Sequence, residues 1–370
     1  FEEKNIFSDH QATFTNQYKG IKNHNISSGI VQSNLNIGFN NHIEDRSIVN
    51  QSNSNQKGLL YSFFLLDQWK FDNSFELQSG IRVAYFEKKN KYYNEPRFAL
   101  KYKIYPSLSL EASIDRHHQF IHRLSNQNNT RGSQNMWVIS SAKIPVISSN
   151  NLHIGLNWEM NDYSISLSGY NYRMQNLFQF ENQFIPAEDL SKSNLKVYLG
   201  SGEKLGSELI IRKKLGVISG WISYQFNQAK YNFQDLNNGE KYLADHNREH
   251  EIKTVLTMRL WNTDFSANWV LSSGGLYTDT EHMDVQPGYN IITNSNRNEK
   301  RLPSIHHLDI NISKSIIISK TLIDIGCSIY NIYNKNNISH KRYNPWTPKL
   351  SMSDVSMFGI TPNAYIKISF

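Results

Sequence analysis

The sequence predicts an all-β protein, a transmembrane antiparallel β-barrel of which about 14–15 strands are present. Two observations predict this class. Strand-like runs meet in pairs at short turns, and the connections between successive pairs are long and polar. Within the runs, apolar and polar residues alternate with a period of two, which is typical of strands with one apolar and one polar face. Helical membrane spans need about 20 consecutive apolar residues, and the sequence contains no such run.

Seven short turns are expected, and each joins two runs. They lie near 19–23, 72–74, 105–107, 161–162, 214–216, 261–263 and 318–320. Seven long connections alternate with them, at roughly 42–57, 88–94, 120–149, 181–203, 232–247, 276–302 and 336–355. Short turns on one rim and long loops on the other are typical of outer-membrane barrels. A soluble sandwich has no need to segregate its loop lengths in this way.

The runs number about fifteen. They extend over 4–18, 25–41, 58–71, 75–88, 95–105, 107–119, 150–160, 163–180, 204–214, 216–231, 248–260, 263–275, 303–317, 320–334 and 356–370. Closed bacterial barrels have even strand numbers, so an odd count favours the C-terminal part of a larger barrel. The alternative is that 4–18 is not a strand and that the barrel closes with about fourteen strands.

The alternation is explicit in several runs. Leu308, Ile310 and Ile312 alternate with Asp309 and Asn311. The same pattern is present at 75–85, 108–115 and 264–271. Because charged residues lie directly between apolar ones, the second face must contact water. A soluble sandwich would also alternate, but its strands usually have about five or six residues, and many of these runs are longer.

The composition excludes several classes of protein. The net charge is +7, but no basic cluster is interleaved with aromatic residues as a nucleic-acid site requires. The single Cys327 excludes an intramolecular disulfide framework and is expected to face lipid or to be packed. The mean hydropathy of −0.55 fits a barrel, because only alternate residues of its strands face lipid.

The last run ends on an aromatic residue. One of its faces consists of Ala364, Ile366, Ile368 and Phe370. A terminal phenylalanine that closes an alternating strand resembles the signal by which outer-membrane barrels are recognised for assembly. We therefore expect Phe370 to be an assembly signal, and we expect the chain to lie in the outer membrane of a Gram-negative bacterium.

Six stretches, in order along the chain, resemble the motifs of one family. They are Glu95–Tyr102, which begins Glu-Pro-Arg; Asp115–His122, with Arg-x-x-Gln-x-x-His; Asn135–Val138, which contains Trp137; Gly220–Tyr224, with Gly-Trp-x-x-Tyr; Arg301–Asp309, with Arg-Leu-Pro-x-x-His-x-Leu-Asp; and Asn331–Lys335, with Asn-Ile-Tyr-Asn-Lys. Each motif is short, but six of them occur at suitable spacing. Together they resemble the barrel of a TonB-dependent outer-membrane receptor of the kind abundant in Bacteroidetes.

The resemblance implies a domain organisation and a set of partners. Such receptors have about 22 strands around an N-terminal plug, so residues 1–370 would be the C-terminal portion of the barrel, and no plug domain is recognised in them. The implied partners are outer-membrane lipid and lipopolysaccharide, a plug and the remaining strands in the same or another chain, the TonB complex through the plug, and a lipoprotein or other outer-membrane partner. A nucleic acid is not expected.

The histidines near 117–122 are the first candidates for a metal or catalytic site. On a straight strand His118 and His122 share a face while His117 points away, so one site with three ligands would need a bend. A structural or rim role is expected, and no metal site. The segment 245–250 has acidic residues and histidines, but it resembles the polar strand start of the family. No nucleophile motif or phosphate-binding loop is present, so we predict neither an enzyme nor a cofactor.

The resemblance implies a receptor or transporter that binds a scarce nutrient, such as a siderophore or a glycan, through its extracellular loops. The candidate ligand-binding residues are side chains of the loops and upper lumen that can stack or form hydrogen bonds: His118, His122, Trp137, Tyr170, Tyr172, Tyr242 and Trp346. For each of them, packing in the girdle or lumen is the alternative. Two other functions stay open, namely a structural barrel subunit of a larger outer-membrane complex and a plugless passive channel.

Overall fold

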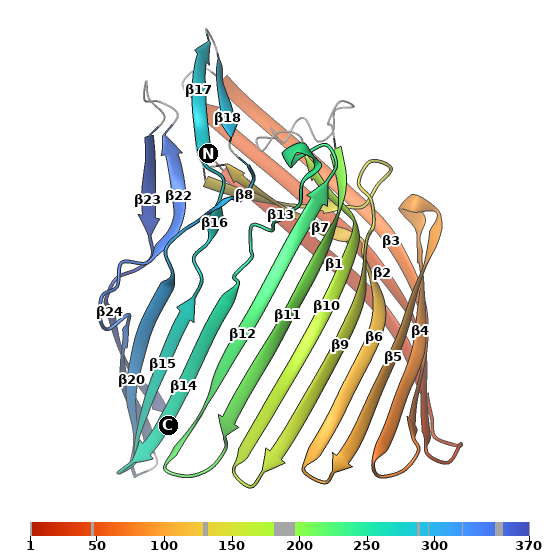
Figure 1. Ribbon diagram of the computed structural model, residues 1–370, viewed down its shortest axis with the longest axis vertical. Coiled ribbons are helices and arrows are strands. Elements are labelled where there is room, and N and C mark those ends of the chain that lie inside the picture. Colours follow the sequence, from red (N-terminus) through yellow and green to blue (C-terminus); the bar gives the residue numbers. More distant parts are fainter. Residues whose placement is uncertain are drawn as a thin grey trace.

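The computed structural model describes residues 2–45, 48–128, 132–180, 197–286, 289–294, 296–319, 321–344 and 351–369. Its main sheet has 16 strands, of which all but β13 (Tyr242–Leu243) follow one another as a continuous ladder. The strands are tilted and curve around a central space, with short turns at one end and long connections at the other (Figure 1). No helix in the described part of the chain is long and apolar enough to cross a membrane.

The ladder follows the order of the chain and is antiparallel throughout. Its strands are β1 (Glu2–Tyr18), β2 (His24–Asp45), β3 (Ile48–Lys70), β4 (Phe75–Phe86), β5 (Lys91–Tyr105), β6 (Leu108–Gln119), β9 (Ile147–Met160), β10 (Tyr163–Phe180), β11 (Val197–Lys213), β12 (Ile218–Phe233), β14 (His250–Leu260), β15 (Thr263–Ser272), β20 (Ile305–Ile318), β21 (Thr321–Tyr330) and β24 (Thr361–Ser369). Because β1 pairs with β2 along its whole length, the alternative that 4–18 is not a strand is wrong.

The seven short turns lie where the sequence predicts them. Several of them contain a residue with a positive φ, which asparagine tolerates: Asn23 and Asn161 adopt φ values of 67° and 39°. At the turn between β3 and β4, the Asp72 carboxylate accepts hydrogen bonds from the backbone N–H groups of Ser74 and Phe75 (2.6 and 2.7 Å). Short polar side chains therefore stabilise the tight turns at this rim.

The long connections contain short elements of their own. These are η1 (Glu87–Lys89), β7 (Ile121–Asn128), β8 (Gly132–Ile139), η3 (Asn237–Gly239), β13, β16 (Leu276–Tyr277), β17 (Thr280–Gln286), β18 (Tyr289–Asn294), β19 (Lys300–Arg301), β22 (Ile338–Asn344) and β23 (Ser351–Ser356). Four pairs of them form separate two-stranded sheets in the described structure, namely β7 with β8, β16 with β19, β17 with β18 and β22 with β23. None of these pairs was among the predicted strands.

Several predicted strand boundaries are wrong because the strands extend further toward the long-loop rim. The ladder of β2 and β3 continues until Asp45 pairs with Ile48, so the expected loop at 42–57 is largely paired backbone. Similarly, β5 begins at Lys91 and β11 at Val197. Backbone pairing needs no apolar side chain, and the Asn- and Ser-rich segment 50–55 therefore pairs without an apolar face.

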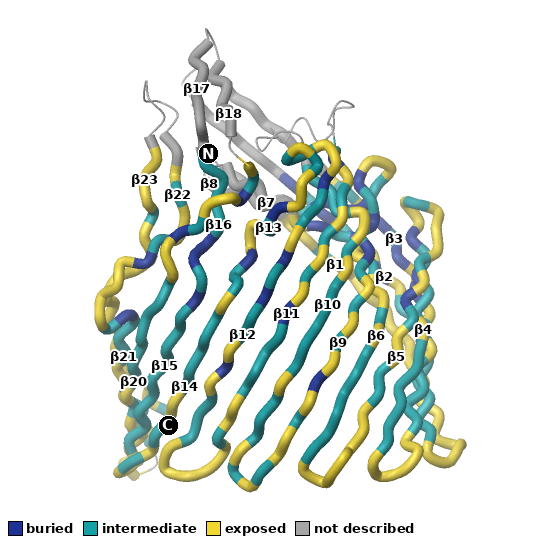
Figure 2. The backbone as a smooth tube through the Cα atoms, viewed as in Figure 1, coloured by how far each residue is buried: buried dark blue, intermediate teal, exposed yellow. Residues whose placement is uncertain are grey.

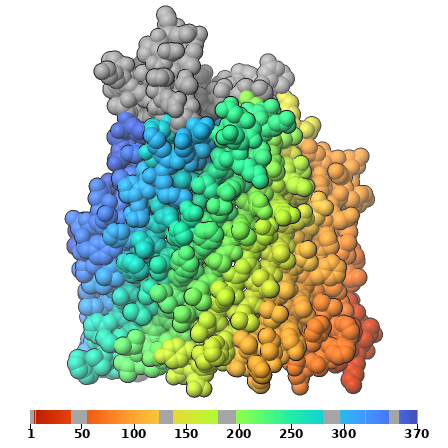
Figure 3. Space-filling model, viewed as in Figure 1, coloured from red at the N-terminus to blue at the C-terminus, as the bar shows by residue number. Residues whose placement is uncertain are grey.

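One face of the sheet carries a belt of exposed apolar side chains. In the ladder, Phe14 pairs with Ile30 and Ile30 pairs with Phe63, and all three are exposed. The same face holds Ile81, Phe98, Ile114, Leu152, Leu167, Leu205, Ile222, Leu256, Ile312, Ile325 and Ile366. The exposed Cys327 also lies on it, paired with Ile312. The predicted alternation is thus confirmed. Seen from outside, the successive strands pack into a continuous wall of diagonal bands (Figure 3).

The opposite, inner face is polar over its lower part, between the short turns and the middle of the strands. Lys101 and Glu111 form an ion pair at 2.7 Å across β5 and β6. The Arg82 guanidinium donates a hydrogen bond to the Ser62 hydroxyl (2.9 Å) across β3 and β4. These paired polar groups satisfy one another on the inner wall, as the sequence pattern predicts for a wet face.

An apolar cluster that was not predicted from the sequence lies inside the barrel near the long-loop rim. We define the inner cluster as Leu35, Ile37, Leu60, Ala84, Phe86, Phe120, Ile139 and Val146. The segment 120–146 supplies its last three members, and β8 within this segment contacts β1, β2 and β3. The wall is therefore two layers thick on this side, and buried residues gather toward this rim (Figure 2).

A glycine makes room for the two layers. Gly58 on β3 is part of the inner face, and a Cβ atom there would lie 3.2 Å from the Phe86 ring and 3.3 Å from the Ile139 side chain. Both distances are shorter than ordinary van der Waals contact. The absence of a side chain at Gly58 thus allows the wall and the crossing segment to pack closely.

Candidate ligand-binding site

Two tyrosines lie side by side on the inner wall of the barrel. Tyr170 and Tyr172 occupy successive inward positions of β10, and their rings stack with centroids 5.1 Å apart and an interplanar angle of 25°. Gly206 of β11 is the ladder partner of Tyr170, and a Cβ atom there would come within 2.4 Å of the Tyr170 hydroxyl oxygen. The glycine therefore lets the Tyr170 ring lie across β11. Both tyrosines are half-buried, so part of each ring is open to the interior.

Polar groups from β11 and β12 surround the Tyr170 ring. The Lys204 ammonium lies 5.3 Å from the ring centroid, and the Gln225 amide donates a hydrogen bond to the Tyr170 hydroxyl (3.1 Å). Asn227 pairs with Gly206 in the ladder and is only 9% exposed. Its side-chain oxygen is buried and has no hydrogen-bond partner among the described residues. Because an unpaired buried acceptor costs free energy, a donor on a ligand would be stabilised here.

Asp115 and Asn151 extend this polar surface beside Tyr172. Asn151 is the ladder partner of both Asp115 and Tyr172, and its amide donates a hydrogen bond to the Asp115 carboxylate (2.7 Å). We define the tyrosine patch as Asp115, Asn151, Tyr170, Tyr172, Lys204, Gln225 and Asn227. The patch combines two aromatic rings with hydrogen-bond donors and acceptors, and it can hold a ring-shaped ligand by stacking and hydrogen bonding.

A second cluster joins several connections at the long-loop rim, with Arg297 at its centre. The Arg297 guanidinium donates a hydrogen bond to the Gln179 side-chain oxygen (2.5 Å) and lies 5.9 Å from the centroid of the Tyr242 ring. Its backbone N–H donates to the Asn237 side chain (2.9 Å). Tyr242 also donates to Gln179 (3.2 Å), and burial raises the pKa of its hydroxyl. Tyr242 is only 5% exposed, so it packs inside the rim and offers little surface to a ligand.

His122 is buried in the segment that crosses the barrel. Its ring lies edge-on to Phe178 with centroids 5.0 Å apart. The Ser140 hydroxyl donates to the Pro145 carbonyl (2.9 Å), so its oxygen accepts the hydrogen bond from His122 Nε2 (2.8 Å). The Nδ1 atom is buried without a hydrogen-bond partner in the described structure, and burial lowers the pKa of His122 to about 4. His122 is therefore a neutral packing residue at neutral pH.

Acidification is expected to loosen the segment around His122. Its pKa is about 4 in the folded protein and about 6.5 when exposed, so the opened segment binds a proton that the folded one does not. The stability of the segment is therefore complete above about pH 6.5, falls as the pH decreases from about 6.5 to 4, and loses about 3 kcal/mol in total. Hydrogen exchange of the amides at 121–123 and 138–146 measures this loss. The variant His122→Phe should remove the pH dependence, and an unchanged dependence would contradict the prediction.

One family model matches nearly the whole sequence. The sequence matches the family described as TonB dependent receptor-like, beta-barrel, over residues 4–352. The chain belongs to this family. The match covers most of the strands of the ladder, and no curated protein matches the sequence.

Solved transporter structures share the fold of this receptor barrel at low sequence identity. The chain is similar to the outer membrane transporter YddB from Escherichia coli, with 11% identity and a TM-score of 0.69 over 98% of this chain and 54% of that chain. It is also similar to the ferric yersiniabactin uptake receptor FyuA from Yersinia pestis, with 10% identity and a TM-score of 0.67 over 100% of this chain and 55% of that chain. The copper transporter OprC is similar too, with 12% identity and a TM-score of 0.68 over 100% of this chain and 57% of that chain. The chain thus spans about half the length of these structures, and the likeness shows the fold alone.

In the receptor barrel, the Glu-Pro-Arg motif closes a gap in the ladder. The pairing of β5 with β6 reaches Arg97 and Asp115, and the strands part beyond them. Glu95, only 2% exposed, fills the gap: its carboxylate accepts hydrogen bonds from the backbone N–H (2.8 Å) and the ring (3.3 Å) of His118, and it lies 3.7 Å from the Arg82 guanidinium. The carboxylate replaces a backbone partner for β6. His118 is therefore a buried packing residue.

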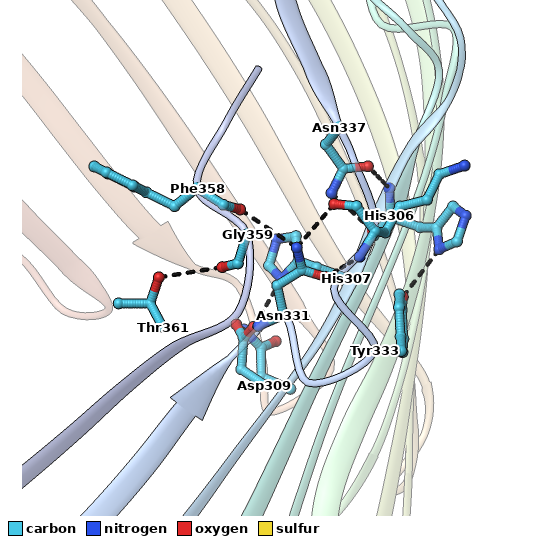
Figure 4. Close-up of polar contacts among 11 residues, drawn as sticks. His306, His307, Asp309, Asn331, Tyr333, Asn337, Phe358, Gly359 and Thr361 are labelled. Atoms are coloured by element: carbon cyan, nitrogen blue, oxygen red, sulfur yellow. Dashed lines mark hydrogen bonds and ion pairs between the residues drawn. The ribbon is translucent and has the colours of Figure 1, made fainter.

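The Asn-Ile-Tyr-Asn-Lys motif of the receptor barrel forms a polar clamp at the long-loop end of β21 (Figure 4). Asn331 is fully buried. Its side chain accepts a hydrogen bond from the Lys335 N–H (3.0 Å) and donates to the carbonyls of Lys335 (2.9 Å) and Phe358 (3.3 Å). Asn337 exchanges two hydrogen bonds with the backbone of His306 (3.0 and 2.9 Å). The clamp thus joins the starts of β20 and β22 to the segment that leads into β24.

The structure brings two of the candidate ligand-binding residues together and places the others apart. Tyr170 and Tyr172 are in the tyrosine patch. Trp137 stacks on Phe7 of β1 with centroids 5.9 Å apart, against the inner cluster. The ligand-binding candidate Trp346 and the expected assembly signal Phe370 lie outside the described residues. Within the residues that the structure describes, no three His, Cys, Asp or Glu side chains come together as a metal site would require.

Sequence reasoning missed the other members of the tyrosine patch. Lys204, Gln225 and Asn227 lie on strands other than that of the two tyrosines, and no local motif marks them. The register of β10, β11 and β12 brings them together. The available signal was the glycine on the inward face of β11 at Gly206, because a glycine within a strand often marks a close approach of another group.

Proposed function

We propose that the chain forms the wall of a TonB-dependent receptor of the Bacteroidetes type, in the outer membrane of a Gram-negative bacterium, and that this receptor takes up a scarce nutrient. The observation that carries the proposal is the tyrosine patch on the inside of a wall whose outer face is an apolar belt. The belt suits contact with lipid, and the patch presents stacking surfaces and an unpaired acceptor to the interior. The family match and the likeness to structures of transporters support the same function.

In this function, the long loops meet the ligand first and the inner wall receives it next. The Arg297 cluster and the Asn331 clamp hold the bases of the loops, so binding does not have to order these segments, and less entropy is lost. The tyrosine patch lies deeper along β10, below its end at Phe180. A ligand there exchanges water for stacking and hydrogen bonds. Movement inward would follow when the TonB complex draws the plug aside.

We propose that a plug and further strands, supplied by the same chain or another one, complete the receptor, with this chain as the C-terminal portion of the barrel. The solved transporters that match it are about twice as long. Lipopolysaccharide would contact the apolar belt, the TonB complex would act through the plug, and a lipoprotein or other outer-membrane partner would lie at the long loops.

Growth on a limiting nutrient tests the proposal. A strain that lacks this chain is compared with its parent, and with a strain that lacks TonB, on a panel of single siderophores and polysaccharides. We expect both deletions to abolish growth on the same nutrient. Growth that requires the chain but not TonB would indicate a passive channel. Unchanged growth, with stable co-purification of surface or periplasmic subunits, would indicate a structural subunit.

A further inference from the structure

We propose that the tyrosine patch binds a neutral saccharide, through the apolar face of a sugar ring and through its hydroxyl groups. The inference rests on the proposed function, because it names the ligand class for the same inner wall. A pyranose ring has a face of C–H groups and a rim of hydroxyl groups. The patch offers a complement to each of these two features.

The aromatic part of the patch suits the C–H face of a sugar. Tyr170 and Tyr172 are stacked and half-buried, so each ring covers part of one face of the other, and the remaining ring surface is open to the interior. Gly206 lets the Tyr170 ring lie across β11, and the Gln225 amide fixes the hydroxyl of this ring (3.1 Å). The surface is therefore formed before a ligand arrives, which lowers the entropy cost of binding.

The polar part of the patch suits hydroxyl groups. The Asn227 oxygen is a buried acceptor without a partner among the described residues, and it lies beside Gly206 at the edge of the Tyr170 ring. The Lys204 ammonium, which lies over the Tyr170 ring, supplies hydrogen-bond donors. A hydroxyl group can donate and accept at once, so one sugar ring can satisfy Asn227 with one hydroxyl and accept from Lys204 with another.

The charges of the patch favour a neutral ligand over an anionic aromatic one. Its ionic side chains are Lys204 and Asp115, which have opposite signs. His246 lies near Lys204 and adds no charge at neutral pH, because burial lowers its pKa. Ferric catecholate complexes carry several negative charges and need concentrated cationic groups. The patch does not provide such a concentration.

Binding of purified protein to defined glycans tests the inference. The full chain is extracted from the outer membrane in detergent and examined by affinity electrophoresis in gels that contain laminarin, pullulan, xyloglucan or mannan. The ferric complex of 2,3-dihydroxybenzoate serves as the anionic aromatic probe, and calorimetry gives Kd values. We expect at least one neutral glycan to bind and the ferric complex not to bind. If none of the four glycans binds, or if the ferric complex binds at the patch, the assignment is wrong.

Variants locate the binding and separate stacking from folding. Tyr170→Ala and Tyr172→Ala should each raise Kd about tenfold, whereas Tyr172→Phe should keep most of the affinity because the ring remains. Tyr365→Ala is the matched control: Tyr365 is an inward tyrosine of β24 whose ring likewise lies over a glycine, Gly326. The proposed site is wrong if Kd is unchanged in both Tyr170→Ala and Tyr172→Ala, or if Tyr365→Ala raises Kd by an equal factor.

The outcome is independent of the growth experiment. Glycan binding is measured on isolated protein and needs neither TonB nor a plug, whereas growth needs energised uptake. If glycans bind at the patch but growth does not depend on TonB, the proposed uptake fails and the saccharide site stands. If growth depends on TonB and the chain but the patch variants bind every glycan normally, the uptake stands and the saccharide site fails.

Discussion

Replacing Phe86 by alanine is expected to lower the stability of the barrel by about 3–5 kcal/mol. Phe86 is fully buried in the inner cluster, between the wall and the segment 120–146, and its ring lies 5.1 Å from that of Phe120. The variant leaves a cavity that the hydrogen-bonded strands around it cannot close. Urea unfolding of the reconstituted protein measures the loss. Hydrogen exchange at 137–146 reports whether the crossing segment detaches.

A phenylalanine on the outer face provides the control for this variant. Phe98 lies on the neighbouring strand β5 and is 52% exposed on the apolar belt. In Phe98→Ala, lipid or detergent can occupy the vacated space, so we expect a clearly smaller loss of stability. If the two variants lose equal stability, the inner cluster does not hold the crossing segment as proposed.

Replacing Asn331 by alanine is expected to cost about 3 kcal/mol, because the variant leaves buried backbone groups without partners. The groups affected are the N–H and carbonyl of Lys335 and the carbonyl of Phe358. Asn331 also has a φ of 50°, a left-handed conformation that asparagine tolerates better than alanine. Urea unfolding measures the overall loss, and faster hydrogen exchange at Lys335 and Ile360 would show that the clamp has opened.

Asn363→Ala is the control for the clamp. Asn363 is an exposed residue of β24, where it pairs with Ser328 in the ladder. Its replacement removes an asparagine close to the clamp without unpairing a buried group, so we expect a change within about 0.5 kcal/mol. Equal losses from Asn331→Ala and Asn363→Ala would contradict a specific role for the clamp.

The short turns and the apolar belt could be predicted from the sequence because both depend on local patterns. Residues such as Asn161 mark a tight turn by their own conformational preference. Likewise, Ile310 and Ile312 mark the lipid face by their alternation with Asp309 and Asn311. The ends of the strands near the long-loop rim were harder to predict from the sequence. In β2 the apolar residues change from even positions, such as Ile30, to odd ones, beginning at Leu35, and only the packing of the crossing segment explains the change.

The tyrosine patch could be predicted only in part. Tyr170 and Tyr172 stand out as an aromatic pair with period two in one strand. Asn227 does not, because an isolated asparagine in a strand has no distinctive pattern, and its importance comes from its burial and its unpaired oxygen. The role of Glu95 was hidden for a similar reason. Its motif was visible, but the gap between β5 and β6 that its carboxylate fills is a property of the assembled sheet.

The crossing segment gives the barrel a thick side and a thin side. The thick side is the wall at β2 to β4, where the described parts of the segment 120–146 add a second layer. The segment also reaches the upper end of β10, where His122 lies against Phe178 and the Asn176 amide donates a hydrogen bond to the Val146 carbonyl (3.3 Å). The second layer therefore narrows the interior unevenly near the long-loop rim. We expect it to displace an entering solute by excluded volume, before any charge or hydrogen bond of the inner wall acts on that solute.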